Sequence, residues 1–151
     1  MAGAAPRADS RHRAREAALQ LLYAWEIGRL ELAPAAEAFW ECQAPKLTAR
    51  HRAFANALAS GVVDHLAELD RLIAETAAHW RFERLTVVDR LILRLGVYEL
   101  LHRPDTPPGV VINEALELAR TFSTEEAVGF VNGNLDAIAR GLASRTTPAE
   151  I

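Results

Sequence analysis

The residue types best suited to binding chemistry lie near the start of this chain, in a cluster of arginines. Residues 11–16 read Arg-His-Arg-Ala-Arg-Glu and lead directly into a segment with apolar residues at helical spacing. Guanidinium groups pair with phosphate oxygens in a planar fork, so the cluster predicts phosphate binding. The formal net charge is −3, so such binding is expected to be local. The alternative is a solvated helix start, although cations there oppose the helix dipole.

An aromatic residue follows the arginines on the same predicted helix. On a helical wheel, Tyr23 falls opposite the centre of the apolar stripe, with arginines to either side. Its neighbours on that polar face are His12, Glu16 and Leu19. An aromatic ring beside arginines is typical of a surface that stacks on RNA bases. Packing of Tyr23 beneath another helix is the open alternative.

A second aromatic candidate lies near the end of the chain. Phe130 lies about 100° from the stripe that contains Val131, because the two residues are adjacent on a helix. Its own face holds Glu126, Gly133 and Asn134, and these small and polar neighbours leave room for a flat ligand. A ring at the edge of the core is the alternative.

Two further arginines, Arg90 and Arg94, share one helix face at a spacing of four residues. The predicted core does not account for them, so they are candidates for a site. The alternative is a solvent-facing surface on which they pair with acids such as Glu99.

Signatures of catalysis, cofactor binding and metal binding are weak. The five histidines show no HExxH spacing, Cys42 is the one cysteine, and no glycine-rich loop follows a predicted strand. We therefore expect no enzymatic activity, no cofactor and no metal. A single thiol suits a reducing cytosol, and no apolar signal core or membrane span is recognisable, so we expect a cytoplasmic protein.

Apolar periodicity and helix-end signals predict an all-α bundle of six or seven helices. The first helix is expected to be capped by Asp9 or Ser10 and to end near Gly28, a plausible C′ residue. A long helix is expected from Thr48 to about His79, with a weak point at Gly61. Capping boxes are expected at residues 86–89 and 123–126, and Gly141 is expected to end the last helix. In this interpretation residues 1–8 form a disordered tail, 9–142 a single helical domain, and 143–151 a flexible tail.

Three separated segments resemble the NusB family of transcription antitermination factors. They are residues 11–23, residues 95–100 (Leu-Gly-Val-Tyr-Glu-Leu), and residues 111–115 (Val-Ile-Asn-Glu-Ala) followed by 130–133 (Phe-Val-Asn-Gly). They occur in the family's order and at compatible spacings, and the match covers roughly residues 10–140. The resemblance implies about seven helices in two small packed sub-bundles. It also implies binding of boxA RNA together with ribosomal protein S10 (NusE), so that RNA polymerase reads through terminators on ribosomal RNA operons.

The resemblance also suggests which residues carry these contacts. The RNA-binding residues are expected to be Arg11, His12, Arg13, Arg15, Tyr23, Arg90, Glu126 and Phe130. The partner-binding residues are expected to be Asp89, Arg94 and Tyr98, although the division of these three between RNA and S10 stays open.

The chain departs from the family pattern at several positions. His12 interrupts what is often an unbroken arginine run, and glycines at positions 109 and 129 stand where lysine is common. Fewer phosphate contacts would weaken RNA binding by the chain alone.

The alternative functions are a purely protein-binding helical module or a stand-alone relative of the RNA-binding domain of ribosomal RNA cytosine methyltransferases. The chain stops near residue 151 without a methyltransferase domain, which argues against the latter. Without S10, a homodimer is also expected to be possible.

Overall fold

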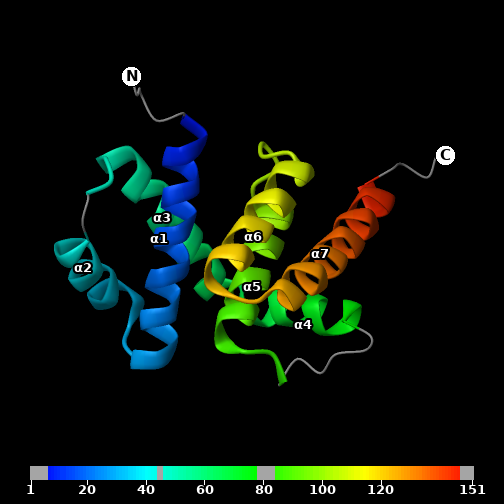
Figure 1. Ribbon diagram of the computed structural model, residues 1–151, viewed down its shortest axis with the longest axis horizontal. Coiled ribbons are helices and arrows are strands. Elements are labelled where there is room, and N and C mark those ends of the chain that lie inside the picture. The colour runs from blue at the N-terminus through cyan, green and yellow to red at the C-terminus, as the bar shows by residue number, and fades with distance from the viewer. Residues whose placement is uncertain (1–6, 44–45, 78–83, 147–151) are drawn as a thin grey trace. The chain divides into compact units, whose positions relative to one another are not determined.

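The computed structural model describes residues 7–43, 46–77 and 84–146, and within these ranges it contains helices and no strands. The predicted all-α class is therefore confirmed for the described residues. Seven α-helices are present (Figure 1): α1 (Arg7–Gly28), α2 (Leu32–Cys42), α3 (Ala49–Asp64), α4 (Leu66–Thr76), α5 (Val87–His102), α6 (Pro108–Phe122) and α7 (Glu125–Thr146). They form two compact units, which divide between Asp64 and His65. None of these helices is long and apolar enough to cross a membrane.

In the first unit, α1 is the central helix, since it packs against both α2 and α3 (Figure 1). The predicted apolar stripe of α1 is buried except at its last residue. Trp25 is only partly buried, and the buried members are Ala14, Ala17, Ala18, Leu21 and Leu22. α3 contributes the buried residues Ala55, Leu58, Ala59 and Val62. A hydrogen bond of 2.9 Å from Trp40 Nε1 to Asn56 Oδ1 joins α2 to α3. The stripe thus sets which side of α1 remains available for binding.

Both ends of α1 differ from the prediction. The helix begins at Arg7, before the predicted caps Asp9 and Ser10, and Gly28, expected as the C′ residue, is the last helical residue. The left-handed φ of 55° belongs to Arg29, whose backbone N–H donates to the carbonyl of Trp25 at 3.0 Å. A side chain at positive φ is strained relative to glycine, so this turn costs some stability.

The long helix predicted from Thr48 to about His79 is wrong, because the chain breaks at His65 rather than weakening at Gly61. His65 has a φ of −122° and a ψ of 23°, and α3 ends before it while α4 begins after it. The spacing of Val62, Leu66 and Leu69 remains helical across this break, so periodicity could not reveal it. Residues 78 and 79 lie outside the described residues.

In the second unit, α5 is the central helix, and it packs against α4, α6 and α7. All residues from Leu91 to Val97 are buried, so α5 has no solvent face over about two turns. Gly96 allows the close approach of α7, because a Cβ there would lie 2.8 Å from Cδ1 of Leu135. The residues at the two ends of α5 are therefore the ones available for contacts with other molecules.

Helix starts in the second unit follow the capping prediction in one case and shift by one residue in the other. Thr86 caps α5, since its Oγ1 accepts the backbone N–H of Asp89 at 3.1 Å. At the start of α7 the cap is Thr124, which accepts from the N–H of Ala127 at 3.1 Å, instead of the predicted Ser123. Ser123 instead donates its hydroxyl to Asp89.

The end of α7 also differs from the prediction. Gly141 was expected to stop this helix, but α7 continues to Thr146, into the segment that was expected to be a tail. Glycine weakens a helix by about 1 kcal/mol without ending it, when the following residues continue the backbone hydrogen bonds.

Candidate nucleic-acid interface

Two of the predicted arginines of α1 meet at one aromatic ring. The guanidinium carbon of Arg11 lies 4.7 Å from the ring centroid of Phe54 on α3, and that of Arg15 lies 5.3 Å from it. Both distances are within the range of cation–π attraction. A ring face attracts a guanidinium without accepting its in-plane N–H groups, so this contact leaves the exposed Arg11 suited to an acceptor such as phosphate.

Arg15 does not lie on an open surface, contrary to the prediction. Its residue is only 3% exposed, whereas Arg11 is exposed. The physical reason is its place on the helix, because Arg15 precedes the buried Ala18 and Leu22 by three and seven residues. Arg15 is therefore part of the packing of α1, and its side chain is less accessible than that of Arg11.

The other two members of the cluster lie between these extremes. His12 is partly buried, and its Nε2 lies 3.1 Å from Oε2 of Glu16, one turn further along α1. The carboxylate lowers the positive potential of the cluster next to His12. Arg13 is also partly buried, on a different side of α1 from Arg11. The cluster is thus spread around the helix rather than gathered in one stripe.

Tyr23 is 44% exposed, which agrees with the surface location that its wheel position predicted. Leu19 was placed on the same polar face but is only 3% exposed, so that part of the wheel interpretation is wrong. Leu19 adjoins the buried Ala18 in sequence, and the buried side of α1 is wider than the predicted stripe. The exposed ring of Tyr23 remains a surface on which a base can stack.

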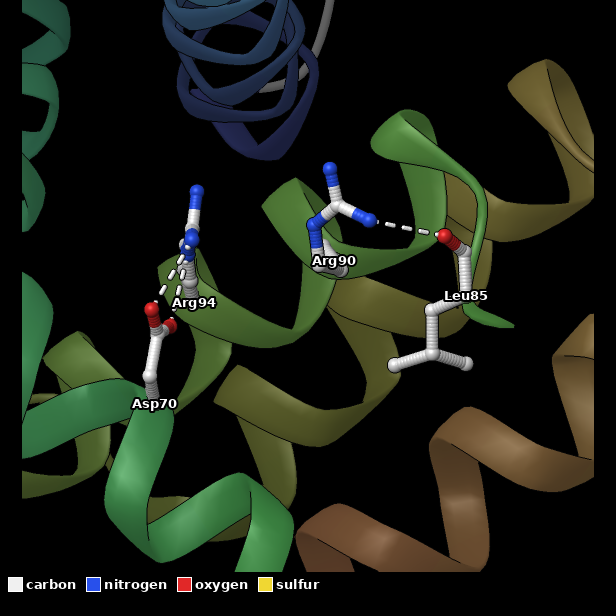
Figure 2. Close-up of polar contacts among 4 residues, drawn as sticks. All are labelled: Asp70, Leu85, Arg90 and Arg94. Carbon is white, nitrogen blue, oxygen red and sulfur yellow. Dashed lines mark hydrogen bonds and ion pairs between the residues drawn. The ribbon is translucent and has the colours of Figure 1, made fainter. Parts of the chain in front are cut away.

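In the second unit, the arginines of α5 are held by groups of their own unit, as Figure 2 shows. The Nε and Nη2 atoms of Arg94 donate to Oδ1 and Oδ2 of Asp70 at 2.7 and 2.9 Å. Arg90 donates from Nη1 to the backbone carbonyl of Leu85 at 2.8 Å. The acid anticipated for such a pair was Glu99, but the acid in this bidentate pair is Asp70 on α4. Arg94 is 7% exposed, so it ties α4 to α5 more than it offers a surface.

The other two predicted partner-binding residues lie at opposite ends of α5. Near its start, Oδ1 of Asp89 accepts the hydroxyl of Ser123 at 2.6 Å, which fixes the carboxylate against the connection before α7. Near its end, the partly buried ring of Tyr98 has its centroid 5.8 Å from the ring of His65 and 5.3 Å from that of His102. Both side chains have defined positions, so they can present a preformed contact surface.

Phe130 is partly buried, and the surface around it is open. A Cβ added at Gly129 or at Gly133 would meet nothing within 4 Å, and Glu126 is exposed. Asn134 was expected on this face but is only 5% exposed, and its Nδ2 donates to the carbonyl of Ile73 at 3.4 Å. The room beside Phe130 is thus as predicted, while Asn134 belongs to the core.

The structure therefore brings the predicted residues together in separate groups. In the first unit, Arg11 and Arg15 share a ring, and in the second, Arg90 and Arg94 are anchored along α5. Residues that sequence reasoning missed are Phe54, Asp70 and Ser123. Each had a weak signal at most, because a ring in an apolar stripe, an acid on a helix and a serine before a helix are all common.

Comparisons with known proteins agree with these features. The model of the NusB family matches residues 12–140. The transcription antitermination protein NusB of Solibacter usitatus is 46% identical over 139 residues, which cover 92% of this chain and 94% of that protein. A solved NusB of T. maritima has a TM-score of 0.78 and 36% identity, and the match covers 86% of this chain and 90% of that one.

A further similar structure is that of the antitermination factors NusB and NusE in complex with dsRNA. It has a TM-score of 0.78 and 31% identity, and the match covers 88% of this chain and 98% of that one. The helical fold, the order of the motifs and the length of the match all agree. The chain belongs to the NusB family of transcription antitermination factors.

Proposed function

We propose that this chain promotes read-through by RNA polymerase, by binding boxA-type RNA of ribosomal RNA transcripts together with ribosomal protein S10 (NusE). Its family membership and its likeness to a NusB solved with NusE and dsRNA support this function. The observation that carries the RNA part is on α1, where guanidinium groups lie over Phe54 and the ring of Tyr23 is exposed. Proteins bind single-stranded RNA with cationic side chains that pair with phosphates and with aromatic rings that stack on bases.

The RNA-binding residues divide by their environment. Arg11 and Arg13 contact phosphates, while Tyr23 and Phe130 stack on bases. Arg15 acts as a positioning residue, because it is buried and shares the ring of Phe54 with Arg11. His12 in the first unit, and Arg90 and Glu126 in the second, are the further residues proposed to contact RNA.

The S10 contacts come from α5. Tyr98 and Asp89 present side chains in defined positions, and we assign to them the direct contacts with S10. Arg94 contributes indirectly, since its bidentate pair with Asp70 holds α4 against the helix that carries both residues. The open positions Gly109 and Gly129 lack the lysines common in the family, so S10 supplies part of the affinity for RNA.

The experiment is a titration of fluorescent boxA RNA, with and without S10, at two salt concentrations. A scrambled RNA of equal length serves as the reference. S10 is expected to tighten binding of boxA RNA more than binding of the scrambled RNA. The Arg11→Ala/Arg13→Ala variant removes two phosphate contacts, so the negative slope of log Kobs against log salt should become less steep by about 1.4.

A control is Arg71→Ala, because this exposed arginine pairs only loosely with Glu75, at 3.6 Å, and its replacement removes one positive charge where the double variant removes two. It should bind RNA like the unaltered chain. If the Arg11→Ala/Arg13→Ala variant loses S10 while S10-independent RNA binding persists, the arginines dock on a protein instead. If S10 gives no gain and both RNAs bind equally, the antitermination function is wrong for this chain.

A further inference from the structure

Three potential metal ligands converge in the second unit, among the residues that the structure describes. His65 precedes α4, Glu68 lies in its first turn, and His102 is the last residue of α5. One ligand atom from each lies within 4.8 Å of the other two. The spacing rules for histidines did not reveal this group, because His102 follows Glu68 by 34 residues.

The donor set and its spacing suit a first-row transition ion. Two imidazoles and one carboxylate form a known zinc-binding combination, and a water completes four-coordination. Two atoms bound to one tetrahedral zinc at about 2.1 Å lie roughly 3.4 Å apart. Nε2 of His102 and Oε1 of Glu68 are already 3.0 Å apart. The remaining ligand atoms need to approach by roughly 1.4 Å at most, a distance within reach of small side-chain rotations.

The surroundings of this cluster also favour a cation. His65 and Glu68 are partly buried, while His102 is exposed, so an ion can enter from solvent. His102 ends α5, where the partial negative charge of the helix dipole attracts a cation. The ring centroids of His65 and His102 are 4.2 Å apart, so both imidazoles lie close enough to bind the same ion.

A comparison within the chain separates this cluster from an ordinary surface pair. His12 and Glu16 on α1 have nearly the same contact, 3.1 Å between Nε2 and Oε2. No third ligand is grouped with them among the described residues, and two ligands hold zinc weakly in water. In the second unit, His102 and Glu68 form the same kind of pair, and His65 adds a second imidazole.

We propose that His65, Glu68 and His102 form a binding site for one divalent transition ion of the zinc class. The ion links the start of α4 to the end of α5 and fixes the two rings that adjoin Tyr98. This site is independent of RNA binding, and its test involves neither RNA nor S10.

The test uses the full chain, without a histidine tag and freed of metal, titrated with zinc chloride by calorimetry. One ion is expected to bind per chain, and cobalt chloride should produce visible ligand-field absorption that zinc abolishes. The His65→Asn and His102→Asn variants should each weaken zinc binding by roughly tenfold or more. His12→Asn is the matched control and should leave zinc binding unchanged.

A second measurement guards against misfolded variants. Glu68→Gln keeps the size of the side chain and is expected to fold, and it should also weaken zinc binding. Zinc should raise the Tm of the unaltered chain and of His12→Asn, but not that of the His65→Asn/His102→Asn variant. Zinc binding that is unchanged in Glu68→Gln and in the double variant would overturn the proposal, as would equal losses in His12→Asn.

Discussion

Two arginine pairs with the same spacing of four residues contact different kinds of group in the two units. Arg11 and Arg15 on α1 lie over the ring of Phe54, whereas Arg90 and Arg94 on α5 are held by a backbone carbonyl and by Asp70. The ring of Phe54 does not offset the charge of the exposed Arg11, whereas the bidentate carboxylate of Asp70 uses two donors of Arg94 and offsets its charge. The comparison teaches that spacing along a helix does not by itself determine the role of an arginine, because a partner on another helix decides whether its charge is offset.

The largest expected effect tests the α5 side of this comparison. Asp70→Ala leaves the mostly buried guanidinium of Arg94 without its carboxylate, so the free energy of unfolding should fall by about 3 kcal/mol. Urea denaturation measures this change. Glu75→Ala on the same helix is the control, because it breaks the exposed pair with Arg71 and should cost less than about 0.5 kcal/mol. If both variants lowered the free energy of unfolding equally, the pair between Asp70 and Arg94 would not stabilise the packing of α4 on α5.

The next effect tests the ring on the α1 side. Phe54→Leu keeps an apolar side chain but removes the cation–π attraction, about 1 kcal/mol, that orders the guanidinium groups before RNA binds. RNA binding must then order them, so boxA RNA in the presence of S10 should bind roughly fivefold more weakly. Fluorescence anisotropy gives this ratio. Phe39→Leu on α2 is the control, since the aromatic ring that Phe39 contacts belongs to Trp40. If both leucine variants bind RNA alike, Phe54 does not orient the arginines.

A smaller effect compares helix starts in the two units. Thr86→Ala removes the cap of α5 and should lower the free energy of unfolding by about 1 kcal/mol. Thr48 also accepts a backbone N–H, from His51, but at 3.3 Å, so Thr48→Ala should cost about half as much. Thermal denaturation followed by circular dichroism ranks the two variants. Thr86→Ser retains the hydroxyl and should stay close to the unaltered chain, and a loss as large as that of the alanine variant would argue against capping.

The smallest effect compares helix ends. Arg29 has a φ of 55°, so Arg29→Gly should raise the free energy of unfolding by about 0.5 kcal/mol. Arg103 follows α5 with a φ of −127°, where glycine only adds freedom to the unfolded chain, so Arg103→Gly should be destabilising. Parallel chemical denaturation of the two variants decides the signs. The same sign for both would contradict a strained turn at Arg29.

The helices could be predicted where local pattern determines them. The apolar stripe from Ala14 to Leu22 and the Thr86 cap depend on residues within one or two turns, and both are observed. The break at His65 could not be predicted, because the apolar spacing continues through it and no proline or glycine stands at that position. Gly141 misled for the opposite reason, since a helix-breaking residue type lies within a helix that continues.

The candidate site could be predicted only in part. The exposure of a side chain depends partly on its position along its own helix, whereas its partner comes from another helix. The exposure of Tyr23 follows from its wheel position, and the burial of Arg15 follows from the same wheel once its spacing to Leu22 is considered. The partners of the arginines come from other helices. Asp70 is 24 residues from Arg94, and nothing in the spacing selects it over nearer acids such as Glu99.

The continuous burial of residues 91–97 in α5 has a consequence for hydrogen exchange. Amides in such a segment exchange only when the surrounding helices open, so they should be among the slowest of the second unit. Tyr98 directly follows this segment, and Asp89 precedes its first residue by two positions. The proposed contact residues thus flank a helical segment whose backbone amides exchange slowly. They would bind a partner without first having to become ordered.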